Sequence, residues 1–352
     1  STNPATGVGT VWLNKSTGEL FNCTDATAGA NVWVNIGGSL GHIWAWQGET
    51  FGFSFGGTKS AVALASIDKY EFASNTTATS HGNLSLGRSG VTGHSSFSNA
   101  HGYSAGGYTF SPSETVNNTI DKFLFASNTT ATDWGDLTIA RWAPASIDSS
   151  THGFQAGGNT SSDVIDKFAF ANNASSADHG DLSSVDAGGD SGGWSTPHYG
   201  YKFGGYNSSL SPTNRDVIAK FSTVSASNAN HIASLTQTRN GAGGSNSTTH
   251  GYASAGQGAA IGGPTNGFST SIDKFDFSSE VNASGHGDLV AGFRPAGGYG
   301  ASSTTHGFAC GGYVYPSITP NTINKFAFAS NTTAADHGDL VAERSSAGMG
   351  QI

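Results

Sequence analysis

The sequence predicts an all-β fold built from six copies of one four-stranded unit, and three observations predict it. The chain of 352 residues contains 51 glycines, about twice the usual share. Charged residues make up 11%, well below the usual level of about 25%, and strong helix formers are few, which argues against helical bundles and coiled coils. One phrase recurs along the chain with a constant internal spacing. The 21 Phe and 7 Trp residues supply apolar surface for a sizeable core.

The recurring phrase defines the units. Its consensus joins a Gly-aromatic pair, a Gly-Gly doublet, an Ile-Asp-Lys-Phe-x-Phe strand and a His-Gly-Asp-Leu phrase, most clearly in residues 153–182. The first glycines recur about every 51 residues, from Gly52 to Gly307. The strand lysine and the leucine are 15 residues apart in all six copies, so the length variation falls elsewhere, chiefly after Gly-Gly. The copies start near residues 50, 100, 151, 198, 249 and 305.

Each copy is expected to contain four short strands. In the third copy they are Thr151–Gly157, the alternating segment Ile165–Phe170, a strand around residues 178–182, and the stretch after the leucine. A period near 50 residues with four strands and a Gly-Gly doublet fits a blade of a kelch-type propeller. Because such a blade cannot bury both faces alone, neighbouring blades must pack and the ring must close. The predicted fold is therefore a six-bladed kelch-like β-propeller with a small N-terminal β module. The stretch after the leucine is expected to begin with Arg at Arg88, Arg141, Arg239, Arg294 and Arg344.

The C-terminus is expected to close the ring. After Leu340 only 12 residues remain, enough for a post-leucine strand but too few for a seventh Gly-aromatic strand. We therefore expect a C-terminal strand at residues 345–352 to complete the blade that begins at Gly52. The alternative that stays open is that residues 42–46 fill this place and the C-terminus is a loose flap.

Residues 1–38 do not match the repeat. They predict a small β attachment module with strands at residues 9–13, 19–23 and 32–36. A linker at residues 39–48 then leads to the propeller at residues 49–352. A module of this size is marginal alone, so it is expected to dock on the propeller, a sister chain or a larger assembly.

Charge and composition argue against several classes of partner. The net charge of −9 opposes binding to nucleic acid or to an anionic membrane surface. The chain has no run of 18 apolar residues, so membrane insertion is not expected. Two cysteines, Cys23 and Cys310, cannot form a disulfide scaffold, and Cys310 is expected to be a packed thiol because other copies have Ala there.

Histidines are the main candidates for chemistry, because they recur before the repeat glycine and before Gly-Asp-Leu. A side chain that recurs in each unit fits a structural role better than a single catalytic site, and Trp134 and Tyr199 replace two of them. We therefore expect imidazoles that bond to backbone groups at turns, and we predict no catalytic residue, no metal site and no cofactor. A metal or catalytic role is the alternative that stays open. The Asp before the strand lysine is expected to have partners across strands or between blades (Asp68, Asp121, Asp166 and Asp273).

The variable connections after Gly-Gly are the predicted binding surface. They lie on the face opposite to the turns of the constant 15-residue hairpins, and loops commonly carry function on a fixed scaffold. Tyr combines an apolar ring with a polar tip, which suits glycan or protein surfaces. Drift of loop length without selection is the alternative that stays open. The predicted binding residues are Tyr108, Tyr206, Phe268, Tyr313 and Tyr315.

Two segments of the chain resemble known phage proteins. The N-terminal VWLNKSTGE (residues 11–19), CTDAT (residues 23–27) and NVWVN (residues 31–35) resemble a short module of tail and fibre proteins of phages, notably those of marine bacteria. The repeats with Ile-Asp-Lys-Phe and Asp-His-Gly-Asp-Leu resemble the kelch-like repeat proteins of the same bacteriophages. Together the resemblances cover nearly the whole chain. They imply a non-enzymatic structural protein of the virion, a tail or tail fibre component made in the cytoplasm of the bacterial host.

The resemblance also suggests partners. Residues 1–38 would contact other virion proteins, copies of the chain would form a homo-oligomer within the particle, and the propeller would contact host-surface glycan or protein during host attachment. Two alternatives stay open, namely a carbohydrate-active enzyme on the same scaffold and a purely architectural decoration subunit. An enzyme should gather unique acids in one cleft, whereas the acids of this chain mostly repeat.

Overall fold

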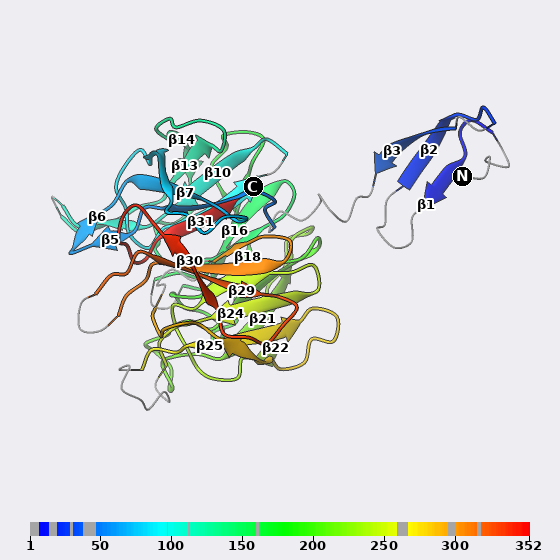
Figure 1. The fold of residues 1–352 in the computed structure, drawn as a ribbon. Helices are drawn as coiled ribbons and strands as arrows, with labels where there is room; N and C mark the ends of the chain where they lie inside the picture. Colours follow the sequence, from blue (N-terminus) through cyan, green and yellow to red (C-terminus); the bar gives the residue numbers. More distant parts are fainter. Residues whose placement is uncertain are drawn as a thin grey trace. The chain divides into compact units, whose positions relative to one another are not determined.

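The chain is all-β in the computed structural model, and it divides into two compact units, Ser1–Trp44 and Ala45–Ile352 (Figure 1). No helix in the described part of the chain is long and apolar enough to pass through a bilayer. The expected linker at residues 39–48 falls mostly outside the described residues, as do residues 42–46. The structure describes residues 7–13, 20–28, 31–37, 47–96, 98–111, 113–159, 162–258, 267–294, 300–314 and 318–352.

Unit 1 contains one antiparallel sheet of three strands, β1 (Val11–Leu13), β2 (Leu20–Asp25) and β3 (Val32–Gly37). On one face, the ring of Trp12 lies 5.4 Å from that of Phe21 and 6.5 Å from that of Trp33. Val11, Leu13 and Val34 remain 45–54% exposed. Because successive side chains of a strand point to opposite faces, apolar groups occupy both faces of this small sheet.

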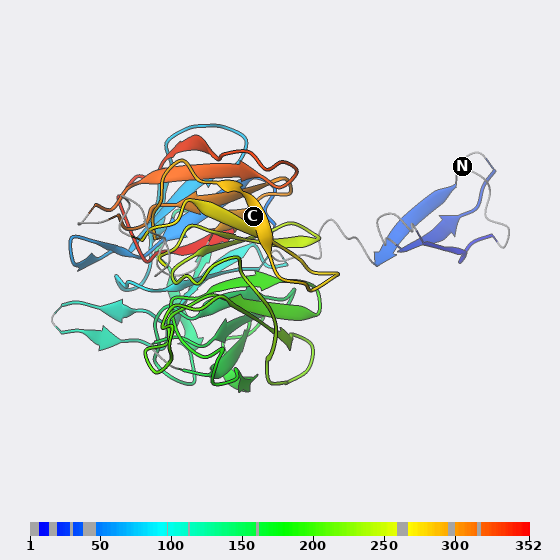
Figure 2. The ribbon, with the colours of Figure 1, turned by 90° about the horizontal axis from the view of Figure 1, so that it is seen from below.

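Unit 2 contains six four-stranded antiparallel sheets within the described residues. Two short hairpins follow Gly-Gly doublets, β5 (Thr58–Lys59) with β6 (Val62–Ala63) and β11 (Tyr108–Thr109) with β12 (Thr115–Val116). Figure 2 shows both hairpins, in blue and blue-green, projecting from the sheets on one side of unit 2. In hydrogen-bonding order, sheet 1 contains β31 (Gly348–Gln351), β4 (Phe51–Phe55), β7 (Ser66–Glu71) and β8 (Thr79–Asn83), and sheet 2 contains β9 (Thr92–Ser96), β10 (His101–Ala105), β13 (Thr119–Leu124) and β14 (Thr132–Asp136). Sheet 3 contains β15 (Ala145–Asp148), β16 (His152–Ala156), β17 (Val164–Ala169) and β18 (Ala177–Asp181), and sheet 4 contains β19 (Gly192–Ser195), β20 (Tyr199–Phe203), β21 (Val217–Ser222) and β22 (Asn230–Ser234). Sheet 5 contains β23 (Gly243–Asn246), β24 (His250–Ser254), β25 (Ser271–Asp276) and β26 (Ser284–Asp288), and sheet 6 contains β27 (Ala301–Ser302), β28 (His306–Cys310), β29 (Thr322–Ala327) and β30 (Ala335–Asp339).

The third strand of each sheet is buried on both faces. In β17, Ile165, Asp166 and Phe168 are all 0–1% exposed. A bulge shifts the β17–β18 register between Ile165 and Asp166, and the other five sheets have a register shift at the same place. Because its side chains are buried on both faces, neighbouring sheets cover both sides of this strand. Its apolar residues belong to the core clusters between the sheets.

The first strands of the six sheets contact one another in a closed cycle. β31 contacts β9, β9 contacts β15, β15 contacts β19, β19 contacts β23, β23 contacts β27, and β27 contacts β31 again. The approach is close, since a Cβ added to Gly93 would lie 1.8 Å from the carbonyl oxygen of Met349, and one added to Gly193 would lie 2.0 Å from that of Ser146. Only glycine fits such an approach, so these positions set how tightly the sheets converge.

A circuit of hydrogen bonds links the same six strands, and we call its side chains the inner ring. The amide N–H of Ser95 donates to Asp148 (3.0 Å) and that of Asp148 donates to Ser195 (2.9 Å). Asn246 donates from its side chain to the Ser195 carbonyl (2.6 Å) and from its amide to Ser302 (2.8 Å). The amide of Ser302 donates to Gln351 (2.9 Å), and that of Gln351 donates to Ser95 (2.9 Å). The inner ring consists of Ser95, Asp148, Ser195, Asn246, Ser302 and Gln351, all at most 3% exposed.

The C-terminal strand belongs to the sheet that begins unit 2. β31 pairs with β4 in an antiparallel register, Gly348 with Phe55 and Gln351 with Gly52, as the sequence analysis expects of the C-terminus. Figure 1 shows β31, in red, among the blue strands of sheet 1. Residues from opposite ends of unit 2 therefore complete one sheet.

Buried Arg–Asp pairs hold the segments that lead from one sheet to the next. Arg88, which precedes β9, contacts Asp121 of β13 at 2.7 Å and donates to the carbonyls of Gly106 and Thr119. Asp121 also accepts hydrogen bonds from the backbone and side chain of Ser85. The same pair recurs in three other sheets, as Arg141–Asp166, Arg239–Asp273 and Arg344–Asp68.

Arg294 does not belong to this set, although the sequence pattern groups it with the other four arginines at the start of the post-leucine stretch. It stands five residues after Leu289, whereas the four paired arginines stand four residues after their leucines. The buried Phe293 occupies the arginine position, and Asn324 replaces the aspartate. Sheet 6 therefore has uncharged residues at both positions.

The histidines of the His-Gly phrase are structural, but they lie in strands rather than at the expected turns. His81 of β8 donates from Nε2 to the carbonyl of Leu124 in the neighbouring sheet at 2.9 Å, and burial lowers its pKa, which favours the neutral ring. Trp134, which replaces this histidine in sheet 2, donates to the carbonyl of Ala169 at 3.0 Å. Both His81 and Trp134 therefore supply a ring N–H donor to a backbone carbonyl of the neighbouring sheet. The other bonds of this kind join His179 to Ser222, His286 to Ala327 and His337 to Glu71.

Candidate functional site

Three of the predicted binding residues occupy one repeated position. Tyr108, Tyr206 and Tyr313 each follow a Gly-Gly doublet directly. Each forms an antiparallel bridge with the segment that leads into its own sheet: Tyr108 with Ser89, Tyr206 with Gly189 and Tyr313 with Arg294. All three are half-buried, so each residue is partly accessible to solvent.

The tyrosines alternate with polar residues around the closed cycle of sheets. They follow the second strands of sheets 2, 4 and 6, while Thr58, Asn159 and Gln257 hold the same position after those of sheets 1, 3 and 5. Thr58 bridges Ser345 and Gln257 bridges Asn240 in the same way. The loop face, meaning the end of the sheets where these Gly-Gly loops lie, thus carries three aromatic positions separated by three polar ones.

The aromatic surface around Tyr108 is larger than the sequence analysis predicts. Its ring lies 4.9 Å from that of Phe110 and 5.6 Å from that of Trp142, both edge to face. Trp142 comes from the segment before β15, which is not one of the Gly-Gly loops in which the sequence predicts the binding residues. Its signal was an aromatic residue directly after the paired Arg141.

Phe268, one of the predicted binding residues, is not a free surface contact. Phe268 is 3% exposed, and its ring lies 5.9 Å from that of Tyr313, so it packs against Tyr313 rather than facing a ligand. Sequence reasoning places it on the surface because it falls in a variable loop, but the loop folds back through the Gln257–Phe268 bridge. Tyr315 lies outside the described residues.

An ion pair spans the loop face. Arg294, before β27, contacts Asp190, before β19. These strands belong to sheets 6 and 4, which are not neighbours in the cycle. Asp190 is 7% exposed and adopts a left-handed φ of 51°. The ion pair therefore links the segment before β27 to the segment before β19. It also places one positive and one negative charge on this face.

Sheet 4 contains a buried charge of a different kind. Lys202 of β20 is fully buried, and its Nζ donates to the Gly204 carbonyl at 2.9 Å. Burial lowers the pKa of Lys202 to about 7, partly opposed by the attraction of Asp186. Asp186 also accepts hydrogen bonds from Ser183 and His231. Lys202 and Asp186 thus supply the buried charges of a sheet in which Ala219 replaces the paired aspartate.

A Ser–His–Asp group near the inner ring does not have the geometry of a catalytic triad. Nδ1 of His94 is 2.6 Å from Asp148, and the Ser146 hydroxyl is also closer to Nδ1 (3.1 Å) than to Nε2 (3.4 Å). A triad needs the serine and the acid on different ring nitrogens. All three side chains are at most 1% exposed, so a substrate has no access to them. The group is best explained as a hydrogen-bonded core network.

Metal and thiol chemistry find little support in the described residues. No group of three or more His, Cys, Asp or Glu side chains in the described ranges could hold a metal ion. Cys310 is buried against the Tyr70 hydroxyl at 3.5 Å, and burial raises the pKa of its thiol to about 12. A thiol with so high a pKa carries almost no thiolate at neutral pH, so it is a poor nucleophile.

The loop face is therefore the candidate binding surface that best combines exposure, aromatic rings and charge. Its residues come from separate sheets, and the Gly-Gly doublets and buried arginines fix the loops that carry them. No protein-family model matches the chain, and no curated protein resembles it in sequence.

Proposed function

We propose that the chain is a structural protein of a phage virion, a non-enzymatic tail or tail fibre component that binds host-surface glycan or protein. Unit 2 is then a six-bladed kelch-like β-propeller. The cyclic contacts of the first strands, the inner ring and the β31–β4 pairing support this architecture. A closed ring places the first strand of each sheet against those of its neighbours and leaves only short, protected sheet edges, which suits a protein exposed on a particle.

The observation that carries the binding role is the alternation of Tyr108, Tyr206 and Tyr313 with polar residues on the loop face. Half-buried tyrosines lose little side-chain entropy on binding and offer both apolar area and a hydrogen bond. Their equivalent positions in alternate sheets present three similar contacts to one large ligand, so weak individual contacts would add up.

Unit 1 supports the attachment role. Its sheet exposes Val11, Leu13 and Val34 on one face, and its other face carries the Trp12 cluster. A three-stranded sheet with apolar groups on both faces gains stability when another surface covers it. In a virion, that surface belongs to neighbouring proteins or to other copies of the chain.

The test of host binding uses the full-length protein and cells of the bacterial host. A variant with Tyr108→Ser, Tyr206→Ser and Tyr313→Ser should lose about tenfold or more in cell binding, because three aromatic contacts are removed. Tyr199→Ser is the matched control, since Tyr199 is 41% exposed but starts the strand β20 at its opposite end. If both variants bind like the unchanged protein and remain folded, the loop face is not the binding surface.

The particle assignment has its own test. Antibodies raised against unit 2 should label a tail or fibre of purified source phage in electron micrographs. Particles that carry no label, although the antibody recognises the denatured protein in infected cells, would rule out a place on the virion surface.

A further inference from the structure

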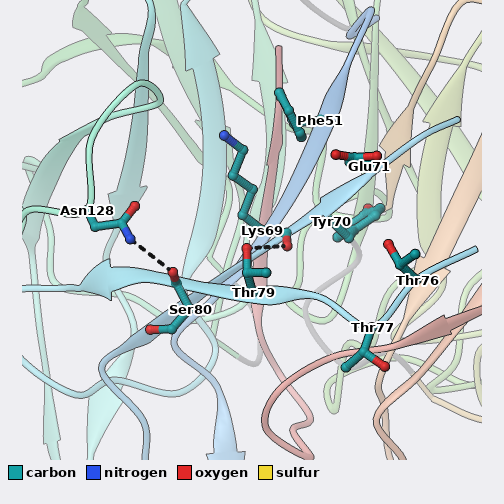
Figure 3. A pocket seen from close by; sticks show the side chains of 9 residues that line it. All are labelled: Phe51, Lys69, Tyr70, Glu71, Thr76, Thr77, Thr79, Ser80 and Asn128. Carbon is teal, nitrogen blue, oxygen red and sulfur yellow. Dashed lines mark hydrogen bonds between the residues drawn. The ribbon is translucent and has the colours of Figure 1, made fainter. Parts of the chain in front are cut away.

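A pocket of about 350 Å³ lies at the end of the sheets opposite to the loop face. It opens between sheet 1 and the turn that joins β13 to β14 in sheet 2, and its volume is within the range of small-molecule sites. Figure 3 shows the side chains around it. The lining residues are Phe51, Lys69, Tyr70, Glu71, Thr76, Thr77, Thr79, Ser80 and Asn128.

Lys69 provides the positive charge of this pocket. Its Nζ lies 3.7 Å from the centroid of the Phe51 ring, a cation–π contact that holds the ammonium group in place. Within the described residues, Lys69 forms no ion pair. Glu71 attracts its ammonium group without forming one and accepts a hydrogen bond from Ser74 at 2.6 Å. The ammonium group can therefore donate to an anion that enters the pocket.

Sheet 4 shows what the same lysine does when a carboxylate is present. Nζ of Lys220, the counterpart of Lys69, lies 3.8 Å from the ring centroid of Tyr199, the counterpart of Phe51. It forms an ion pair with Glu280, which comes from the turn between β25 and β26 of the next sheet. The Tyr201 hydroxyl donates to the same carboxylate at 3.3 Å. The chain thus contains its own example of a carboxylate bound at this position.

Asn128 replaces that glutamate in the pocket. It stands six residues after the strand lysine Lys122, as Glu280 stands six residues after Lys274. The Asn128 side chain donates to the Ser80 carbonyl at 3.3 Å and carries no charge. Sheet 1 therefore keeps the aromatic ring and the lysine but lacks the acid that the turn of the next sheet supplies to Lys220. The pocket lies in this region.

The rest of the lining suits hydroxyl groups. Thr76, Thr77 and Ser80 are exposed and present hydroxyls that both donate and accept hydrogen bonds. Glu71 adds an acceptor, as Figure 3 shows on the side of Phe51 and Tyr70. Such mixed donors and acceptors around one fixed cation match a polyol that carries a single negative charge.

We propose that this pocket binds a sugar carboxylate, namely a hexuronate residue of an acidic polysaccharide. The carboxylate contacts the Lys69 ammonium group where Glu280 contacts Lys220, and the sugar hydroxyls bond to the threonine and serine hydroxyls. The site does not depend on the particle assignment or on the tyrosines of the loop face, so either proposal can fail without the other.

The direct test is calorimetric titration of the full-length protein with glucuronate, glucose and acetate. Glucuronate should bind, and its affinity should fall as salt is added because the contact is partly ionic. Glucose, which lacks the charge, and acetate, which lacks the hydroxyls, should each bind about tenfold or more weakly. No binding of glucuronate to the folded protein, or equal binding of all three, would overturn the proposal.

Variants separate the pocket from the rest of the surface. Lys69→Gln should weaken glucuronate binding about tenfold or more. Asn128→Glu should weaken it similarly, because it installs the internal acid found in sheet 5. Lys220→Gln is the matched control and should leave binding unchanged. Melting curves establish that each variant is folded, and unaltered binding by folded Lys69→Gln or Asn128→Glu would overturn the site.

Discussion

The buried Arg and Asp positions of the repeat are occupied in three different ways among the six sheets. Four sheets use an Arg–Asp pair such as Arg88–Asp121, with both side chains 0–1% exposed. Sheet 6 has Phe293 and Asn324 at these positions, and sheet 4 has Asp186 and Ala219 there, with the positive charge supplied by Lys202 of β20. A buried charge without a partner is costly, so a change at one member of the pair requires a change at the other.

A substitution at the Arg88–Asp121 pair tests this dependence. Arg88→Phe leaves the Asp121 carboxylate buried without its guanidinium group, and we expect the free energy of unfolding to fall by about 3–5 kcal/mol. Adding Asp121→Asn copies the Phe293–Asn324 arrangement and should restore part of the loss. Urea denaturation of both variants measures the two values. A single variant that loses less than the double variant would contradict this account.

Lys202 predicts a pH dependence of stability. Its pKa is about 7 in the folded protein against an ordinary value of 10.5. Below pH 7 both states hold the proton and the full cost of burying the charge applies. As pH rises from about 7 to 10.5, the unfolded state binds more protons than the folded state, so the contribution of Lys202 to stability rises. Above that range both states are neutral and the change stops.

The measurement compares the full-length protein with Lys202→Met. Between pH 7 and pH 10, the unfolding free energy of the unchanged protein should gain on that of the variant, by up to about 1.4 kcal/mol per pH unit. The variant removes the titrating group, so effects of other groups cancel in the difference. A difference that is constant across this range would show that Lys202 does not titrate there.

Individual site residues were predictable only as far as the chain repeats. Tyr108, Tyr206 and Tyr313 could be found because they share one position after Gly-Gly. Trp142 is visible in the sequence as an aromatic residue after Arg141, but its contact with Tyr108 was not predictable, because only the packing of adjacent sheets brings the two segments together. The Lys69 pocket likewise depends on Asn128 of the next copy, and a single copy of the repeat gives no sign of it.

At the scale of elements, periodicity predicted where the strands lie better than it predicted their register and the hydrogen bonds between sheets. The all-β class is confirmed, and the expected strand Ile165–Phe170 corresponds to β17 at Val164–Ala169. The register shift after Ile165 was not predicted, because the alternation of side chains within one strand says nothing of how that strand pairs with the next. The same alternation assigns Ile165 and Asp166 to opposite faces but does not show that both faces are buried. The inner ring was also missed, since Ser95, Asp148 and Gln351 share only the ability to accept a hydrogen bond.

Removal of the C-terminal strand tests its role as an element. Deleting residues 348–352 removes β31, exposes the backbone edge of β4 and breaks the inner ring at Gln351. We expect a large drop in melting temperature together with aggregation, because an unpaired edge strand templates intermolecular pairing. Light scattering during thermal denaturation records both effects. An unchanged melt with no scattering would mean that β31 is not needed to complete sheet 1.

At the scale of the whole molecule, unit 1 and unit 2 have different sources of stability. Unit 2 covers its sheets with one another around a closed cycle. Unit 1 leaves Val11, Leu13 and Val34 about half exposed in the chain alone. Association through unit 1 should therefore be separable from the folding of unit 2.

The double variant Leu13→Asp and Val34→Asp tests that separation. Charges on this apolar face should weaken self-association of the full-length protein by about tenfold or more, because they must be desolvated in the interface. Sedimentation at several concentrations measures association. The melting of unit 2 should not change, and Thr58→Ser in unit 2 serves as a control that leaves association as it was. Equal association of the variant and the unchanged protein would exclude this face as the contact.

The pairing of β31 with β4 also has a consequence for synthesis. β31 is synthesised after the strands of all the other sheets of unit 2, yet it completes the sheet whose other three strands are made first. Sheet 1 therefore stays incomplete until residue 351 has been made, and a chain terminated before β31 keeps an open edge at β4 that quality-control proteases can recognise. The late pairing thus separates chains with a complete unit 2 from truncated ones.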